Sequence, residues 1–197
     1  MTVLKAIRDA ASSVRAFFEP SRNPSTSTLM THAAVKAEID RLASRIGAVN
    51  AESLPTHGYS EQSGRPHIEI NEDGYHYVVA ERGTEDSRLT TQDVDELLYK
   101  ILESVTFTLA FDYELKHRIE NQDCRRIGFQ KQIELLTILL PEWAGRCGQE
   151  HTRILREHPF DDDASVRATL SKELRDEGHA PEDAWRIASE KYPEPNC

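Results

Sequence analysis

The feature that most constrains this chain is a densely charged segment, residues 112–132, which lies between two strongly apolar stretches. Residues 97–111 before it and 133–140 after it both carry apolar side chains at helical spacing. A charged block between two core-forming helices predicts either a solvated hairpin tip or a network of ion pairs. The block holds no metal-ligand cluster and no nucleophile–base signature, which favours a protein that works by binding.

Apolar residues recur every three or four positions along much of the chain, the pattern of amphipathic helices. We predict helices over residues 3–18, 31–46, about 94–115, 124–140 and 142–158, and a last pair separated by Gly178. Thr90 is placed to cap the third of these helices, and Leu115 continues its apolar pattern. Trp185 belongs to the apolar pattern of the final helix.

A single stretch of the sequence carries a clear β signal. Residues 67–70 and 75–79 are rich in β-forming side chains and flank Asn71-Glu72-Asp73-Gly74, a strong turn sequence. A further short strand is expected near residues 86–89, which makes a small antiparallel meander. The predicted fold class is therefore α+β, mostly helical, with a β-hairpin or meander packed on long helices.

Proline and Ser/Thr residues mark a linker over residues 19–31. We therefore expect an N-terminal amphipathic helix with its linker at residues 1–29, followed by one α+β domain at residues 30–197. Residues 48–66 contain two glycines and two prolines and are predicted to form an irregular loop.

The composition limits the partners and the compartment. A formal net charge of -10 disfavours nucleic acid and anionic lipid and suits either a basic partner or solubility alone. No signal peptide and no apolar run long enough to span a membrane are found, and the three cysteines form no CxxC pair. These features predict a cytoplasmic protein with reduced thiols and no cofactor.

Candidate catalytic and metal-binding residues each have a structural alternative. His117 and Glu120 supply half of a carboxylate-bridged metal site, but a second such pair is missing, so we predict no metal. His67 and His76 lie on the two hairpin strands, where exposed positions are expected. Cys124 has cationic neighbours that would lower a thiol pKa, yet packing in the core is the favoured interpretation.

The charges within the block pair well on helices. Glu114 and Arg118 are four residues apart with the acid first, the favourable order. Asp112, Asp123, Arg125 and Arg126 are predicted to join the ends of two helices by bidentate contacts. We favour a network that fixes helix geometry over a ligand site.

Several segments taken together resemble a known bacterial family. They are HIEINEDGYHYVVAERG, then RLTTQDVDELLYKILESVTFTLAFDYELKHRIENQDCRRIGFQKQIELL, PEWAGR and EHPFDD, which together cover about residues 67–163. This order of segments is similar to the family called immunity protein 63. The matching charged positions are Glu81, Arg82, Asp112, Arg118, Glu120, Asp123, Arg125 and Arg126.

The resemblance implies an intracellular antidote that binds and blocks a cognate toxin delivered by sibling or neighbouring bacteria, as in contact-dependent inhibition. It implies no catalysis. From charge alone, we expect a basic toxin to dock on an acidic surface made of Glu69, Glu72, Asp73, Glu85 and Asp86. The alternatives are a small hydrolase that uses histidines and carboxylates, and an acidic adaptor or nucleic-acid mimic.

Overall fold

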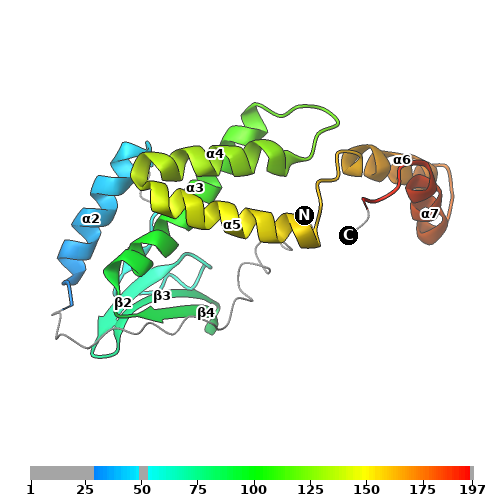
Figure 1. Ribbon diagram of the computed structural model, residues 1–197. Helices are drawn as coiled ribbons and strands as arrows, with labels where there is room; N and C mark the ends of the chain where they lie inside the picture. The colour runs from blue at the N-terminus through cyan, green and yellow to red at the C-terminus, as the bar shows by residue number, and fades with distance from the viewer. Residues whose placement is uncertain (1–28, 49–52, 196–197) are drawn as a thin grey trace. The chain divides into compact units, whose positions relative to one another are not determined.

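The computed structural model describes residues 29–48 and 53–195 (Figure 1). The helix predicted over residues 3–18 lies outside the described residues. The chain divides into two compact units. Among the described residues, one unit contains residues 29–37 and 55–97, and the other contains residues 38–48, 53–54 and 98–195. The predicted boundary after residue 29 stays a prediction.

The described residues form an α+β, mostly helical fold, as predicted. The helices are α2 (His32–Arg45), α3 (Val94–Lys116), α4 (Cys124–Leu139), α5 (Pro141–Glu157), α6 (Ala164–Asp176) and α7 (Pro181–Lys191). The strands are β1 (Thr56–His57), β2 (His67–Asn71), β3 (Gly74–Glu81) and β4 (Thr84–Thr91). Pro141 begins α5 at its first turn, where the missing N–H costs nothing.

The four strands form one sheet in the order β1-β2-β3-β4. The predicted hairpin is confirmed, because β2 and β3 are antiparallel and Asn71 pairs with Gly74 across the turn. Gly74 has φ +124°, and an added Cβ would lie 2.4 Å from the carbonyl oxygen of Thr91. Only glycine fits this backbone and this close approach. The meander is also confirmed, with β4 longer than expected.

The two edges of the sheet differ. The edge on the β2 side is covered by β1, which pairs in parallel with β2, and by residues 62–64, which bond to the end of β3. Residues 48–66 were predicted to be wholly irregular, and β1 corrects this prediction. The β4 edge has no such cover among the described residues.

Three sequence predictions for the residues of the sheet are wrong: the exposure of His67, the exposure of His76 and the capping role of Thr90. His67 and His76 are both 4% exposed rather than solvated. The ring nitrogens of His76 lie 2.9 Å from Thr90 Oγ1 and 2.8 Å from Asn71 Oδ1, so polar partners compensate its burial. Thr90 is thus a strand residue, and Asp93 caps α3 by accepting a hydrogen bond from Asp95 N–H.

The helical unit is built around aromatic packing between α3, α4 and α5. Phe111, Phe129 and Ile154 are buried together, with Phe107, Cys124 and Leu155 packed against them. The rings of Phe111 and Phe129 meet edge to face, with 6.4 Å between centroids. Core packing is therefore the observed environment of Cys124, and burial raises the pKa of its thiol.

Two apolar residues lie outside the core positions that periodicity predicted. Leu115 is 63% exposed and Trp185 is 44% exposed. The buried positions of α7 are instead Ala184 and Ala188, whose small side chains allow close approach of α6, the helix against which α7 packs. Periodicity finds the buried stripe of a helix but does not decide how closely two helices approach.

Gly128 lies inside α4 where a larger residue does not fit. A Cβ there would lie 2.7 Å from the Phe111 ring. We expect Gly128→Ala to destabilise the fold by about 1–3 kcal/mol, because overpacking outweighs the helix propensity that alanine adds. Urea denaturation followed by circular dichroism measures this change.

Gly145→Ala is the matched control within α5. No heavy atom lies within 4 Å of its added Cβ, so this variant should gain up to about 1 kcal/mol. Equal stabilisation by both alanines would contradict the proposed close contact between α3 and α4.

Candidate functional site

Arg88 organises the acidic residues of the sheet. Its Nη1 donates to Glu69 Oε2 at 2.7 Å, while Nε and Nη2 donate to the two oxygens of Glu85 at 2.9 and 2.7 Å. These hydrogen bonds hold the pKa of both carboxyl groups below their usual range. Glu69, Glu85 and Arg88 therefore form one charged cluster on one face of the sheet.

The five predicted docking residues do not form one compact patch. Glu72 and Asp73 are exposed in the β2–β3 turn, next to the end of β4. Glu85 and Asp86 lie near the start of β4, about six residues away along β3, which corresponds to roughly 20 Å. Asp86 is the extra residue of a β-bulge, because β3 places Ala80 opposite Glu85 and Val79 opposite Ser87.

A polar hollow of about 340 Å³ lies beside the cluster made by Arg88. His67 lines it and places Nε2 3.2 Å from Glu69 Oε1. The other ring nitrogen of His67 is buried, with no hydrogen-bond partner among the described residues. Gln62 and Tyr59 complete the wall from the loop before β2. The hollow presents carboxylate oxygens to any side chain that enters it.

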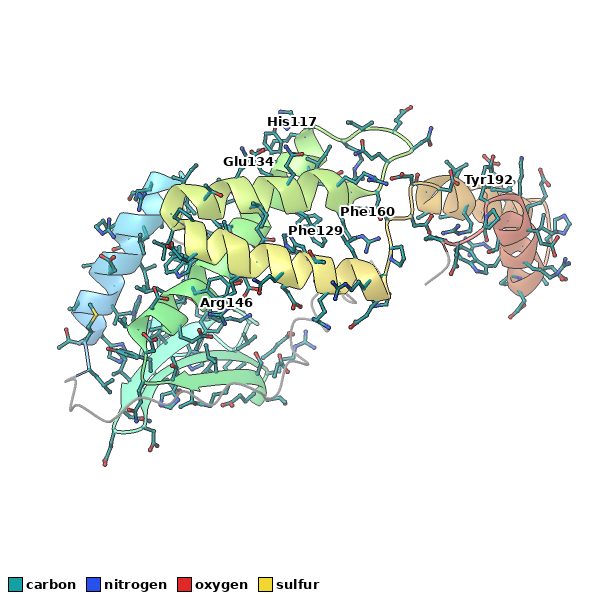
Figure 2. All side chains as sticks on the ribbon, in the orientation of Figure 1. His117, Phe129, Glu134, Arg146, Phe160 and Tyr192 are labelled. Atoms are coloured by element: carbon teal, nitrogen blue, oxygen red, sulfur yellow. The ribbon has the colours of Figure 1, made fainter. Side chains whose placement is uncertain are left out.

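In the helical unit, the predicted helical ion pair is present. Arg118 donates from Nε and Nη2 to the two carboxylate oxygens of Glu114, at 2.9 and 2.8 Å. Glu114 is only 1% exposed, so the guanidinium compensates a buried charge. His117 follows the end of α3 and stacks on Tyr113, with 3.9 Å between the ring centroids (Figure 2).

Asp123 and Arg125 form the centre of the predicted network. Arg125 Nη2 lies 2.5 Å from Asp123 Oδ2, and both side chains are almost fully buried. Arg125 also donates to the carbonyl oxygens of His158 and Pro159, at 2.8 Å each. Asp123 caps α4 through Arg125 N–H and accepts from Asp161 N–H. The pair therefore joins the start of α4 to the segment after α5.

Further charged residues extend this network towards α6 and α7. Arg126 makes a bidentate pair with Asp162 at 2.9 and 2.8 Å. Arg167 of α6, only 2% exposed, pairs with Asp161 and donates to the carbonyl oxygen of Tyr192 at 2.7 Å. Asp112 was expected in this network, but the described contacts do not include it.

The other family-pattern residues lie outside these networks. Glu81 is the last residue of β3 and pairs with Arg82, the next residue, across 3.4 Å, while Asp112 and Glu120 are exposed. Among the residues described, no group of three or more His, Cys, Asp or Glu is placed to hold a metal ion. None of the described helices is long and apolar enough to cross a membrane.

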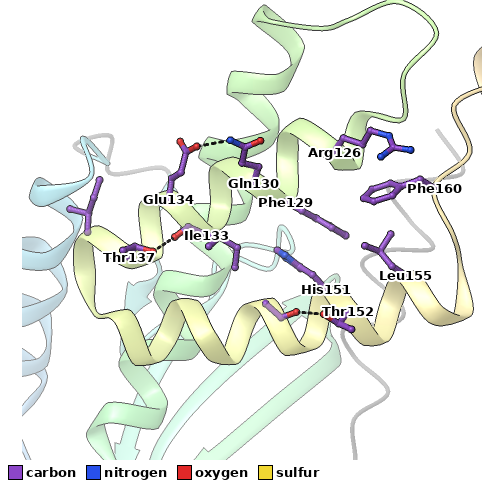
Figure 3. A pocket seen from close by; sticks show the side chains of 12 residues that line it. Arg126, Phe129, Gln130, Ile133, Glu134, Thr137, His151, Thr152, Leu155 and Phe160 are labelled. Carbon is purple, nitrogen blue, oxygen red and sulfur yellow. Dashed lines mark hydrogen bonds between the residues drawn. The ribbon is translucent and has the colours of Figure 1, made fainter.

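Sequence reasoning missed a groove of about 750 Å³ on α4 and α5 (Figure 3). Phe129, Ile133, Leu155 and Phe160 line it, and His151 lies at its wall. The ring of His151 stacks on Phe129 with 3.8 Å between centroids. The spacing of Phe129 and Ile133 gave the buried face of α4, but not the opening that remains beside α5.

His151 also belongs to a buried polar trio. Its Nε2 lies 3.0 Å from Gln132 Oε1 and 3.3 Å from Cys147 Sγ. Gln132 Nε2 donates to Glu103 O, so its Oε1 is the acceptor that His151 Nε2–H requires. That nitrogen is therefore not free to take the thiol proton. The i, i+4 spacing of Cys147 and His151 was the sequence signal for this contact.

The pKa values of the trio also oppose nucleophilic catalysis. Burial raises the pKa of the Cys147 thiol to about 12 and lowers that of His151 to about 4. Both groups are neutral at pH 7, whereas a cysteine nucleophile needs a thiolate. We interpret the trio as a hydrogen-bonded part of the core.

Comparison with known proteins finds a family model that matches part of the chain. Residues 71–153 match the family model described as Immunity protein 63, which confirms the resemblance predicted from the sequence. The matched range runs from the end of β2 through most of α5 and includes every charged family-pattern position named above. Searches of curated proteins and of solved structures gave no match.

The low pKa of His151 predicts a pH dependence of stability. The unfolded chain binds a proton near pH 6.5, whereas the folded protein does so only near pH 4. The contribution of His151 to the free energy of unfolding is therefore fully present above about pH 6.5. It falls as the pH drops, by about 2 kcal/mol between pH 7 and pH 5. Urea denaturation at the two pH values measures this loss.

His151→Gln removes the titrating group and so measures how much of the pH-dependent loss of stability comes from His151. The variant should lose about 2 kcal/mol less than the original protein over the same pH interval. An identical loss in both proteins would show that His151 is not the group responsible.

Asp123→Ala tests the buried ion pair. We expect a loss of about 3–5 kcal/mol, because Arg125 would remain buried without its counter-charge and α4 would lose its cap. The control, Glu134→Ala, removes an exposed pair with Lys131 and should cost less than about 1 kcal/mol. Similar losses in thermal or urea denaturation would contradict the importance assigned to the buried pair.

Proposed function

We propose that this chain, whose residues 71–153 match immunity protein 63, neutralises a cognate bacterial toxin by binding it and occluding it sterically and electrostatically. The family match is the observation that carries this proposal. We further propose that the toxin is delivered by contact with neighbouring bacteria and meets its antidote in the cytoplasm.

The charge distribution supports a basic partner. The chain has a formal net charge of -10, and residues 67–91 contain six acidic and two basic side chains. An acidic surface accelerates capture of a basic partner and repels nucleic acid. A nuclease toxin is basic where it holds its substrate, so its binding surface suits this antidote.

The proposed docking surface remains Glu69, Glu72, Asp73, Glu85 and Asp86. Its members differ in what they offer to a partner. Glu69 and Glu85 already bind Arg88, so part of their charge is compensated within the protein. Glu72, Asp73 and Asp86 are exposed and are the residues whose charge is available for long-range attraction.

No observation favours the alternatives predicted from the sequence. A hydrolase needs an activated nucleophile or base, and the contact between Cys147 and His151 joins two neutral groups. A nucleic-acid mimic needs carboxylates at regular spacing along one face. The docking residues instead divide between the two ends of the sheet.

Reversing the three available charges tests the proposed surface. The triple variant Glu72→Lys, Asp73→Lys and Asp86→Lys leaves the contacts of Arg88 in place. It should bind the cognate toxin domain, taken from the neighbouring reading frame, with an association rate at least about tenfold lower at low salt. The salt dependence of that rate should also weaken. Stopped-flow or surface-plasmon measurements give both values.

A second triple variant controls for net charge. Glu173→Lys, Glu177→Lys and Glu194→Lys change three exposed acids by the same amount outside the sheet. This protein should associate almost as fast as the original. Equal slowing by both variants would remove the sheet surface as the docking site, and complete lack of binding by the unaltered protein would refute the proposed function.

A further inference from the structure

In the described part of the chain, strand β4 leaves one edge of the sheet unpaired. It is the terminal strand in the order β1-β2-β3-β4, and it runs for eight residues, Thr84–Thr91. Within the described part of the chain, no backbone hydrogen bond reaches β4 from outside the sheet. Alternate residues of a strand direct their N–H and C=O groups to opposite sides. About half of the backbone groups of β4 therefore point away from β3.

Among the residues that the structure describes, the fold protects the opposite edge but not this one. On the β2 side, β1 and residues 62–64 use the outward backbone groups. Natural sheets guard their free edges with bulges and charges, and β4 has its bulge at Asp86. Beyond the bulge, Ser87–Thr91 pairs with β3 in regular register. Five consecutive residues thus keep the geometry that a further strand needs.

The charges beside this edge select the partner. Glu85 and Asp86 are exposed at one end, and Glu72 and Asp73 lie in the turn at the other. Arg88 is the one basic residue of β4, and its guanidinium is bound to Glu69 and Glu85. An extended segment that lies along β4 would therefore meet acidic side chains at both ends of the strand.

The polar hollow lies on one face of the sheet, towards which every second side chain of an added strand would project. Glu85 and Arg88 share that face, because they pair with Ala80 and Val78 on alternate positions of β3. The hollow of about 340 Å³ presents oxygens of Glu69 and Glu85. A lysine or arginine side chain from a neighbouring strand would share these two carboxylates with Arg88.

We propose that β4 pairs with an extended, cationic segment of the toxin domain, which adds a strand to the sheet. The inference rests on the proposed function and specifies how the toxin is held. Backbone hydrogen bonds supply affinity in this mode, and side chains on alternate positions supply specificity. The bulge at Asp86 sets one end of the paired segment.

Residue-resolved hydrogen exchange of the full chain, free and bound to the inactivated toxin domain, tests this mode. In the free protein, alternate amides between Ser87 and Thr91 should exchange quickly. In the complex these amides should exchange at least about tenfold more slowly, because they become hydrogen-bonded within a sheet. The amide of Glu72 is an internal control, since the turn has no place in an added strand.

Each outcome separates the inference from the proposed function. Slowing confined to β4 supports strand addition. Slowing that is equal at Glu72 and along β4 means that the toxin covers this face without extending the sheet, and it overturns the inference. A complex that forms while the β4 amides keep their free rates also overturns the inference but leaves toxin binding intact. Failure of the toxin domain to bind at all, measured by calorimetry, refutes both.

Discussion

The buried pair of Asp123 and Arg125 holds the helical unit together where the start of α4 meets the connection between α5 and α6. Two segments meet there: the start of α4, and the connection between α5 and α6, through the carbonyl groups of residues 158 and 159 and the N–H of Asp161. Each buried charge is compensated by a counter-charge and by further hydrogen bonds, the condition under which burial of ions is tolerated. Arg167 then joins the same segment to the end of α7. Without this network, the α6–α7 hairpin would have few anchors.

Much of this arrangement follows from local sequence. The spacing of Glu114 and Arg118 predicts their ion pair, because residues four apart on a helix are neighbours. Asp123 also caps α4, a local contact that charge pattern and periodicity did not predict. The other partners, Asp161 and Asp162, lie almost 40 residues away. The local density of charge predicts an ion-pair network, but tertiary packing determines which residues belong to it. For this reason the prediction wrongly included Asp112.

The sheet shows the same division between local and long-range information. The turn around Gly74 is local chemistry, and the sequence predicts it correctly. Strand β1 has two residues and pairs in parallel with β2, so no periodicity reveals it. The two histidines were misplaced for a related reason, since alternation within a strand does not say whether both faces of the sheet are covered. The acidic residues were identified, but their separation along the sheet depends on register.

The placement of polar groups also argues for binding over chemistry. Three buried titratable groups of the helical unit have partners: Arg125 and Glu114 pair with counter-charges, and His151 bonds to an amide oxygen. The uncompensated charges lie outside, at the turn and on the edge strand. A catalyst needs its unsatisfied groups inside a cavity, where burial shifts their reactivity. A binding protein needs them on a surface, where they attract a partner and then pair with it. This difference is the reason for which we propose the sheet as the surface that meets the toxin.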